Sequence, residues 1–345
     1  MQDVAKHAGV SVRTVSNVVN NYVYVSQAMR ERVQASLDHL GYEMDYVARG
    51  LRSGRTGMVA LVIPQLAEPY FAELAQAVIR AAAHRGLSVL IEATEDDAET
   101  EKRIMKGALA TVADGVLLSA SQATIEDPPD VPLVLLGEHT ATPYGDHVGI
   151  DNVAAARTVV RHLLSQGRER LAALGVNNSD TAVLRLRGFH EELDAWGIGS
   201  ASRLELATGD WSPRGGYEAV DRLLSADRRA LPQAVFAFND SLALGSLRVL
   251  RENRIQVPGQ VAVAGIDDLA QSAFVDPPLT SLAPDLDEIA ESALSALTLQ
   301  IEGRSGRHEY RRKLTSFELK VRESSVCTDA DNIKQLSALE GLDEQ

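Results

Sequence analysis

The sequence predicts an α/β protein with a small all-α helix-turn-helix head and a body of two α/β subdomains with parallel sheets. Three short helical patterns fill residues 1–44, and the polar segment SGRTG at residues 53–57 separates them from the rest. From Met58 to Gly265, short apolar runs alternate with helical patterns. This alternation is typical of parallel sheets with helices on both faces. The elements are too many for one sheet, so we expect two subdomains.

In the head, the first helical pattern covers residues 3–7 and stops at Gly9. Ser11 and Ser26 precede the second and third patterns, and serine is favoured just before the first turn of a helix. Gly41 ends the third pattern, as glycine often does after a helix. The apolar positions expected to form the small core are Val4, Ala5, Ala8, Val15, Val18, Val19, Met29, Val33, Ala35, Leu37 and Leu40. A tight turn at residues 8–10 makes the first two helices a helix-turn-helix.

In the body, the run MVALVIP is continuous and apolar, as expected of a buried parallel strand. Strands are expected at residues 58–64, 88–94, 115–119, 132–137, 170–174, 202–206, 234–238 and 261–265. Helices are expected at residues 72–85, 99–112, 154–166, 184–196, 215–225 and 241–252. Ligands of such sheets bind beyond the carboxyl ends of the strands. We therefore expect a small molecule in the cleft between the subdomains.

The composition is that of a globular protein with a sizeable core. The chain has 345 residues, of which 45% are apolar and 24% charged, and its formal net charge is −14. Residues 1–57 hold seven Lys or Arg against five Asp or Glu, a net charge of +2 that leaves −16 for the remainder. A basic head on an acidic body is expected when only one end contacts phosphate, although +2 is small enough to arise by chance. No apolar window is long enough to span a membrane, and the start does not resemble a signal peptide, so we expect a cytoplasmic protein.

The sequence lacks the motifs that several classes of enzyme require. The first apolar run is not followed by the GxGxxG of a dinucleotide site, and no phosphate loop ending in GK[ST] occurs. No Ser–His–Asp set stands out, and none of the eight histidines has metal-ligand spacing with another. The single cysteine, Cys327, excludes an internal disulfide framework and a multi-cysteine zinc site. We therefore expect no enzyme, no cofactor and no metal.

Seven motifs in order resemble the LacI/GalR (lactose/galactose repressor) family of bacterial transcription regulators. They are DVAKHAGVSVRTVSNVVN, VARGLRSGRTG, PYFAEL, VGIDN, TGDWSPRGGYEA, FAFNDSLALGSLRVLRENRIQVPGQVAVAGIDD and DPPLTSL. The resemblance covers about residues 1–325 and implies a DNA-binding repressor with a core like a periplasmic binding protein. It implies a homodimer on a pseudo-palindromic double-stranded operator, switched by a small-molecule effector. The residues described below favour a sugar as this effector. The alternatives are a nucleoside or other polar metabolite as effector, or a sugar-binding receptor without DNA binding.

The resemblance, combined with the patterns, predicts five segments. They are a helix-turn-helix domain at 1–44, a hinge helix and linker at 45–57, an N-terminal core subdomain at 58–150 and 284–312, a C-terminal effector-binding subdomain at 151–283 and 313–326, and a disordered acidic tail at 327–345. The dimer interface is expected on the helices near Tyr70–Arg85 and Leu286–Ile301.

The second helix of a helix-turn-helix enters the major groove of DNA and reads base edges with its outer face. The positions that match the family's DNA contacts are Val12, Arg13, Thr14, Ser16, Asn17 and Asn20. Arg13 could pair with guanine and Asn17 with adenine, whereas Val12 could contact a thymine methyl group. The plain alternative is an ordinary surface helix. Position 17 is usually arginine in this family, so the family's common half-site is not expected to carry over.

Residues 45–52 resemble the hinge helix of the family, which lies in the minor groove when two copies pair. Leu51 matches the apolar wedge that opens a base step, and Ala48 lets the two helices approach. Arg49 and Arg52 would face phosphates. An eight-residue stretch is too short for a stable helix in water, so we expect it to order on DNA. Without the resemblance, a plain linker would be the favoured interpretation.

Nine residues at strand ends or in loops are expected to contact the effector. They are Tyr70, Phe71, Asp151, Thr181, Arg185, Trp211, Asn239, Asp240 and Asp267. An aromatic face, one arginine and several Asn or Asp side chains suit a sugar, because the ring stacks and the polar groups bind hydroxyls. Each has a structural alternative: Asp240 could cap the following helix, Phe71 could belong to the core, and Asp267 could cap a turn.

Overall fold

The structure is a computed structural model that describes residues 1–19, 22, 24–41, 55–106, 112–119, 131–137, 144–226, 231–303 and 310–326. The contacts within the chain divide it into two units, Met1–Thr56 and Gly57–Gln345. The division falls inside the segment that separates head from body in the sequence. Each unit is described by itself below.

The described part of the head contains the helices α1 (Gln2–Ala8), α2 (Val12–Val19) and α3 (Gln27–His39). Helix α1 ends at Gly9, whose φ of 62° is a left-handed conformation that glycine adopts without strain. Ser11 and Ser26 accept hydrogen bonds from the backbone N–H groups of Thr14 and Met29, so both serines cap helices as expected. The start of α1 has no side-chain cap.

The core of the head differs from the expected set at two positions of α3. Ala35 and Leu40 are exposed, whereas Ser36 is buried. The Ser36 hydroxyl donates to the backbone oxygen of Arg32 at 3.0 Å and hydrogen-bonds His7 Nδ1 at 3.1 Å. These two bonds satisfy the buried hydroxyl, so a polar residue can occupy the core position. The fully or largely buried apolar residues are Val4, Ala5, Ala8, Val15, Val18, Val33 and Leu37.

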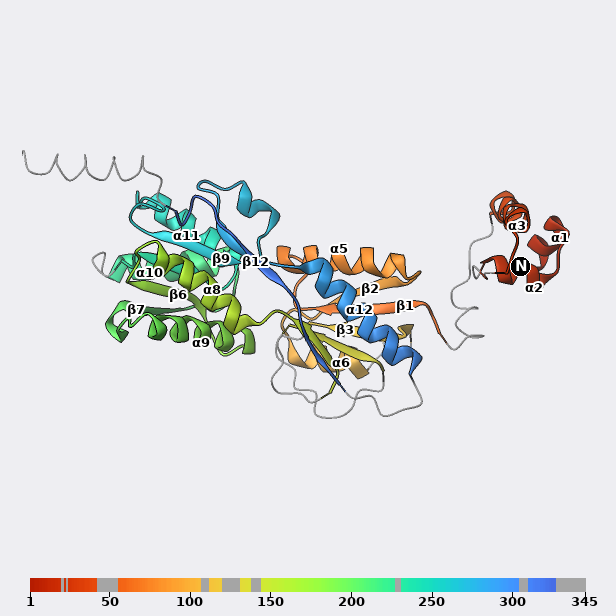
Figure 1. Cartoon of the computed structure of the whole chain (residues 1–345), viewed down its shortest axis with the longest axis horizontal. Coiled ribbons are helices and arrows are strands. Elements are labelled where there is room, and N and C mark those ends of the chain that lie inside the picture. Colours follow the sequence, from red (N-terminus) through yellow and green to blue (C-terminus); the bar gives the residue numbers. More distant parts are fainter. Residues whose placement is uncertain are drawn as a thin grey trace, which may run out of the picture. The chain divides into compact units, whose positions relative to one another are not determined.

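The body contains two six-stranded sheets, the first of which forms the N-terminal subdomain (Figure 1). The strand order of this sheet is β11-β5-β4-β3-β1-β2, and every pairing in it is parallel. Its strands are β1 (Met58–Ile63), β2 (Ser88–Ala93), β3 (Gly115–Leu118), β4 (Leu133–Leu136), β5 (Asp146–Gly149) and β11 (Arg312–Leu314). Its helices are α5 (Pro69–His84), α6 (Ala98–Lys106) and α12 (Leu286–Glu302).

The alternation of side chains along β1 explains the layers of this subdomain. Val59, Leu61 and Ile63 pack in a core that includes α5 and α12. Ala60 and Val62 pack in a second core with Ile104 of α6. Because successive residues of a strand point to opposite faces, the sheet is covered on both sides, as its continuous apolar sequence predicts. Helices α5 and α12 lie side by side (Figure 1).

The second sheet forms the C-terminal subdomain, with the strand order β12-β10-β9-β8-β6-β7. Its strands are β6 (Leu171–Val176), β7 (Arg203–Ala207), β8 (Ala234–Ala237), β9 (Ala262–Ile266), β10 (Thr280–Pro284) and β12 (Phe317–Lys320). Its helices are α8 (Asn152–Ser165), α9 (Asp180–Ala195), α10 (Pro213–Ala226) and α11 (Asp240–Glu252), with short 3₁₀ turns at Ser200–Ser202 and Ala270–Ala273. Only β12 is antiparallel to its neighbour, β10.

Two glycines allow α10 and α11 to pack closely. A Cβ atom on Gly216 would lie 2.2 Å from the Leu242 backbone oxygen, and one on Gly245 would lie 1.9 Å from that of Pro213. Neither contact can be relieved by a side-chain rotation, because both involve backbone. Glycine at these positions therefore sets the distance of α11 from α10, and the start of α11 lies at the cavity described below.

The chain crosses between the two subdomains three times, near residues 150, 285 and 315. The third crossing lies between β11 and β12, so Lys313 and Leu314 belong to the first sheet and not to the C-terminal subdomain as expected. Hydrogen bonds connect the crossings: the Thr315 N–H donates to Gly149 O at 2.9 Å and the Asp285 N–H to Ser316 O at 3.1 Å. Strands β5, β10, β11 and β12 were not anticipated from the sequence.

Candidate functional site

A cavity of about 450 Å³ lies between the two subdomains. It is bordered by residues that lie one or two positions after strands, including Gln65 after β1, Ser119 after β3, Asn177 after β6, Asn239 after β8 and Asp267 after β9. The cavity therefore lies where it was expected, beyond the carboxyl ends of the parallel strands of both sheets.

Among the described residues that border the cavity, Arg185 is the one with a cationic side chain. It belongs to α9 and is 6% exposed. Its Nε donates to Asn152 Oδ1 at 2.8 Å, and its Nη1 donates to the backbone oxygen of Phe238. Burial lowers the pKa of Arg185, and the nearby carboxylate of Asp267 opposes that effect. With these bonds holding the guanidinium in place, its remaining N–H groups are available to ligand hydroxyls.

Trp211 provides an aromatic face in a fixed position. Its indole N–H donates to Gly175 O at 2.8 Å, and its ring centroid lies 5.5 Å from Cζ of Arg185. Asn239 donates from Nδ2 to the Trp211 backbone oxygen at 3.0 Å and accepts from the Leu242 N–H at 2.9 Å. Asn239 thus caps α11 and positions Trp211, with little hydrogen-bonding capacity left for a ligand.

Asp267 places a buried carboxylate at the cavity. It is 8% exposed and has a φ of 119°, a conformation that is strained for a residue with a side chain. Burial raises its pKa well above the usual value, an effect that Arg185 counteracts. Burial, followed by the charge of Asp267, also raises the pKa of Tyr70. A carboxylate in this setting binds hydroxyl donors strongly, because few other donors are present.

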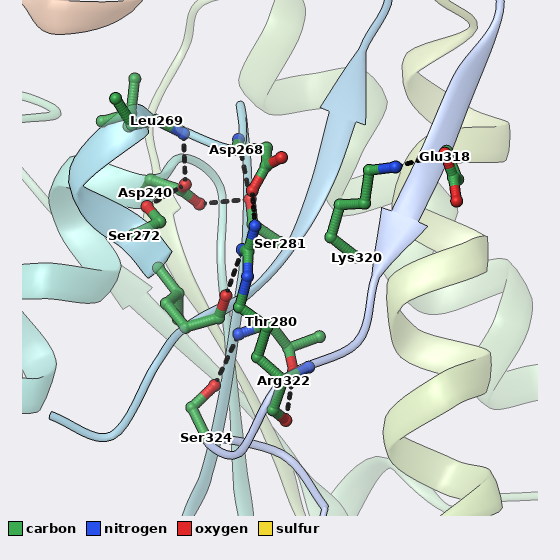
Figure 2. A network of polar contacts seen from close by, with 12 residues as sticks. Asp240, Asp268, Leu269, Ser272, Thr280, Ser281, Glu318, Lys320, Arg322 and Ser324 are labelled. Atoms are coloured by element: carbon green, nitrogen blue, oxygen red, sulfur yellow. Dashed lines mark hydrogen bonds and ion pairs between the residues drawn. The ribbon is translucent and has the colours of Figure 1, made fainter. Parts of the chain in front are cut away.

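Asp240 does not border the cavity but holds residues of the neighbouring loop 267–273 and of β10 by hydrogen bonds (Figure 2). It is fully buried, and its carboxylate accepts from the hydroxyls of Ser272 and Ser281, each at 2.6 Å, and from the Leu269 N–H at 3.0 Å. Burial raises its pKa to about 7, although the three hydrogen bonds oppose that shift. The alternative that Asp240 caps α11 is wrong, because Asn239 is the capping residue.

Seven of the nine expected effector residues border the cavity: Tyr70, Phe71, Thr181, Arg185, Trp211, Asn239 and Asp267. Asp151 and Asp240 do not. Asp151 caps α8 instead, with its Oδ1 accepting from the Ala154 N–H at 2.9 Å. Phe71 borders the cavity and also packs against the core of its subdomain. Polar residues that the sequence did not single out include Gln65, Glu68, Asp96, Asn152, Asn177, Ser179, Asp180 and Asp210.

The second helix of the head presents a mixed outer face. Val12 is 41% exposed, and Arg13 is also exposed. Thr14, Ser16 and Asn17 are half-buried, and the Thr14 hydroxyl is 2.8 Å from that of Ser11. Within the described residues, the Arg13 guanidinium has no hydrogen-bond partner, so it is the side chain of this helix best able to reach outward. The other expected DNA-contacting residues, Asn20, Ala48, Arg49, Leu51 and Arg52, lie outside the described residues.

Comparisons with known proteins agree with this architecture. Residues 1–45 match the family model described as bacterial regulatory proteins, lacI family, and residues 160–325 match a periplasmic binding protein-like domain. The ribose operon repressor of Escherichia coli (strain K12) is 32% identical over 308 residues, which are 87% of this chain and 92% of that protein. The chain belongs to the LacI family.

Solved structures of this family extend over nearly the whole chain. The Lac repressor dimer bound to operator and the anti-inducer ONPF is 26% identical, with a TM-score of 0.77 over 94% of this chain and 98% of the other. The complex of the transcriptional regulator CelR with cellobiose is 31% identical, with a TM-score of 0.68 over 94% and 98%. A LacI-family protein is a DNA-binding transcription regulator, and the relatives named here are regulators rather than enzymes.

Within the described parts of this LacI-family chain, no three His, Cys, Asp or Glu side chains are grouped so as to hold a metal ion. In the same residues, no helix has the length and apolar character needed to cross a membrane.

Proposed function

We propose that this protein is a cytoplasmic repressor that binds a pseudo-palindromic operator as a homodimer and is switched by a sugar bound in the cavity. The observation that carries the sugar assignment is the group formed by Arg185, Asp267 and Trp211 at the carboxyl ends of the strands. Trp211 has its N–H bonded to the protein, which leaves the ring for stacking on a pyranose or furanose. Arg185 and Asp267 offer a donor and an acceptor for neighbouring hydroxyls. The ribose operon repressor and the CelR–cellobiose complex agree with this assignment.

The charges at the cavity favour a neutral sugar over an anionic ligand. Four acidic residues, Glu68, Asp96, Asp180 and Asp210, border it in addition to Asp267, against the single cation of Arg185. A phosphate or carboxylate group would meet several like charges, which disfavour its binding. A nucleoside stays the second candidate, because Trp211 could stack equally well on a base.

Helices α5 and α12 are proposed to form the homodimer interface. They lie against each other, with Arg80 bonded to Asp287 at 2.7 Å. Each also leaves a large apolar side chain exposed: Ile79 is 39% exposed and Leu299 is 64% exposed. A second copy covering these helices would remove that apolar surface from water.

The two tryptophans of the chain allow a direct test of the cavity. Trp196 donates to Glu192 at the end of α9, whereas Trp211 borders the cavity. In a Trp196→Phe variant, fluorescence reports on Trp211 alone. We expect the sugar that releases the protein from its operator in a gel shift to change this emission with the same midpoint concentration, whereas sugars that leave the operator bound should have no effect. Release without any change in emission would place the sugar elsewhere.

Arg13→Ala is expected to weaken binding of the dimer to the operator by a factor of about 30 or more, because one bidentate arginine–guanine contact is lost in each half-site and each contributes about 1–3 kcal/mol. Binding to unrelated DNA should change less. Gln34→Ala, on an exposed position of α3, is the matched control and should bind like wild type. The measurement is fluorescence anisotropy with operator and scrambled duplexes at fixed salt. Equal losses on both duplexes would assign Arg13 to phosphate contact.

The same anisotropy experiment distinguishes the proposed repressor from the alternative receptor. A sugar-binding receptor without DNA binding would show no preference for any duplex. The hinge at residues 45–52 lies outside the described residues and stays a prediction.

A further inference from the structure

Two hydrogen bonds join the subdomains at a place away from the three chain crossings. The Ser241 hydroxyl donates to Glu68 Oε1 at 2.6 Å, and the Ala270 N–H donates to Glu73 Oε1 at 3.0 Å. Both glutamates belong to the beginning of α5 in the N-terminal subdomain. Glu68 is the residue before the first turn of α5, yet its side chain makes no capping bond within that helix. Its carboxylate is therefore directed at the other subdomain.

The partners of the two glutamates are held together by Asp240. Ser241 follows Asp240 directly in α11, and Ala270 lies in the loop 267–273. The Asp240 carboxylate fixes that loop through the Leu269 N–H and the Ser272 hydroxyl (Figure 2). Because Asp240 is fully buried, these bonds are shielded from water. The C-terminal subdomain thus offers Ser241 and Ala270 as one preformed surface.

The same loop also carries the cavity residue Asp267, three positions before Ala270. Glu68 borders the cavity as well. A ligand bonded to Asp267 and a glutamate bonded to Ala270 therefore act on one short loop. A displacement of the loop at Asp267 would therefore also displace Ala270, and the reverse, because the hydrogen bonds to Asp240 restrict the movement of the loop.

The charges near Asp267 make the contact of Glu68 and Glu73 with the C-terminal subdomain depend on the ligand in the cavity. Burial raises the pKa of Asp267 most, the charge of Arg185 opposes that effect, and the charges of Asp240, Glu68 and Glu73 raise the pKa further. Approach of α5 to the loop therefore brings like charges together. Hydroxyl groups of a bound sugar would donate to these carboxylates and reduce the repulsion, which favours closure.

We propose that Glu68 and Glu73 form a latch that closes the cleft by binding Ser241 and the N–H of Ala270, and that loop 267–273 couples this latch to the cavity. Only the identification of the cavity as the effector site rests on the proposed function. The bonds between the crossings, such as Thr315 to Gly149, do not involve the latch and can persist when it opens.

The latch can be tested in the full-length protein without effector or DNA. Spin labels are placed at Arg103 of α6 and Arg251 of α11, both exposed and outside the helices proposed to form the dimer, after Cys327→Ser. Labelled protein is diluted with unlabelled protein so that the distances measured lie within one chain. The distance distribution is measured by pulsed electron paramagnetic resonance. We expect the Glu68→Ala/Glu73→Ala variant to shift to longer and broader distances. The matched control is Glu92→Ala, an exposed glutamate of β2 in the same subdomain, and it should leave the distribution unchanged.

Hydrogen exchange at the amide of Ala270 gives a second readout. Ala270 is exposed, and its N–H is bonded to Glu73 across the cleft. We expect Glu73→Ala to speed its exchange at least tenfold and Glu73→Gln, which keeps an acceptor oxygen, to restore most of the protection. Circular dichroism confirms that each variant is folded.

Unchanged label distances together with unchanged exchange at Ala270 would overturn the latch, and operator binding would be unaffected by that result. Conversely, failure to bind any operator would remove the proposed function, while the label distances would still report on the latch.

Discussion

Arg185→Met is expected to abolish effector-induced release from the operator and to lower the free energy of unfolding by about 3–6 kcal/mol, because two hydrogen bonds from a buried charged donor are lost and each contributes about 1.5–3 kcal/mol. The variant removes the bonds to Asn152 and the Phe238 backbone oxygen and leaves Asp267 buried without its cation. Urea unfolding gives the free energy, and anisotropy with the releasing sugar gives the response. Arg187→Met, an exposed arginine of the same helix, is the matched control and should change neither.

A second substitution separates stability from recognition. In Arg185→Met/Asp267→Asn, the buried carboxyl group that faced the lost cation is also gone, so we expect the unfolding free energy to recover part of the loss, while the part due to the bonds to Asn152 and Phe238 stays. The response to the sugar should not recover, because both hydroxyl-binding groups are missing. A double variant that regains the response would show that these two residues support the fold and do not bind the effector.

Eight of the described strands, β1 to β4 and β6 to β9, could be predicted from the sequence because their own residues carry an apolar pattern. The run at residues 58–63 is apolar throughout, since β1 is buried on both faces. By contrast, β11 consists of the exposed residues Arg312, Lys313 and Leu314 and becomes a strand only through pairing with β5. Strand β12 likewise depends on β10, to which it pairs antiparallel. Such pairing depends on tertiary context that local periodicity does not contain.

Errors in helix boundaries caused two of the errors in the candidate site. The helix expected to start at residue 154 starts at Asn152, which makes Asp151 its cap. The helix expected from Ser241 starts at Asp240, so the capping position passes to Asn239 and the Asp240 side chain turns into the core. A shift of one residue rotates a side chain by about 100° around the helix axis, enough to exchange cavity for interior.

Other site residues could not be inferred because their roles arise from distant contacts. Asn152 orients Arg185 from 33 residues away, and Glu68 meets Ser241 across 173 positions of sequence. Trp211 and Arg185, in contrast, were identified by their loop or helix-start positions and by the family resemblance. The functional residues near strand ends could thus be predicted, whereas the hydrogen bonds that orient their side chains could not.

Asp240→Asn is expected to reduce the pH dependence of stability between pH 4 and pH 8. Burial raises the pKa of Asp240 from 3.8 in the unfolded chain to about 7 in the folded protein. Between these values the unfolded state releases the proton while the folded state keeps it, so the free energy of unfolding of the wild type falls as the pH rises. The stabilisation is fully present below about pH 4 and is lost by about pH 7. Its size is on the order of 4 kcal/mol, because each pKa unit corresponds to about 1.4 kcal/mol.

The asparagine side chain does not titrate, so the part of the slope due to Asp240 should disappear, while the part due to Asp267 should stay. Asparagine also places an N–H₂ group where one carboxylate oxygen accepts from Leu269 or Ser281, which costs about 1 kcal/mol at every pH. We therefore expect Asp240→Asn to be slightly less stable than wild type below about pH 4 and more stable by about 3 kcal/mol at pH 8, as measured by urea unfolding. Asp151→Asn, which keeps an oxygen to cap α8, is the control with the wild-type slope. If Asp240→Asn retained the full slope, the carboxylate would have to be ionised in the folded protein throughout this range, and its hydrogen bonds to Ser272, Ser281 and Leu269 would outweigh its burial.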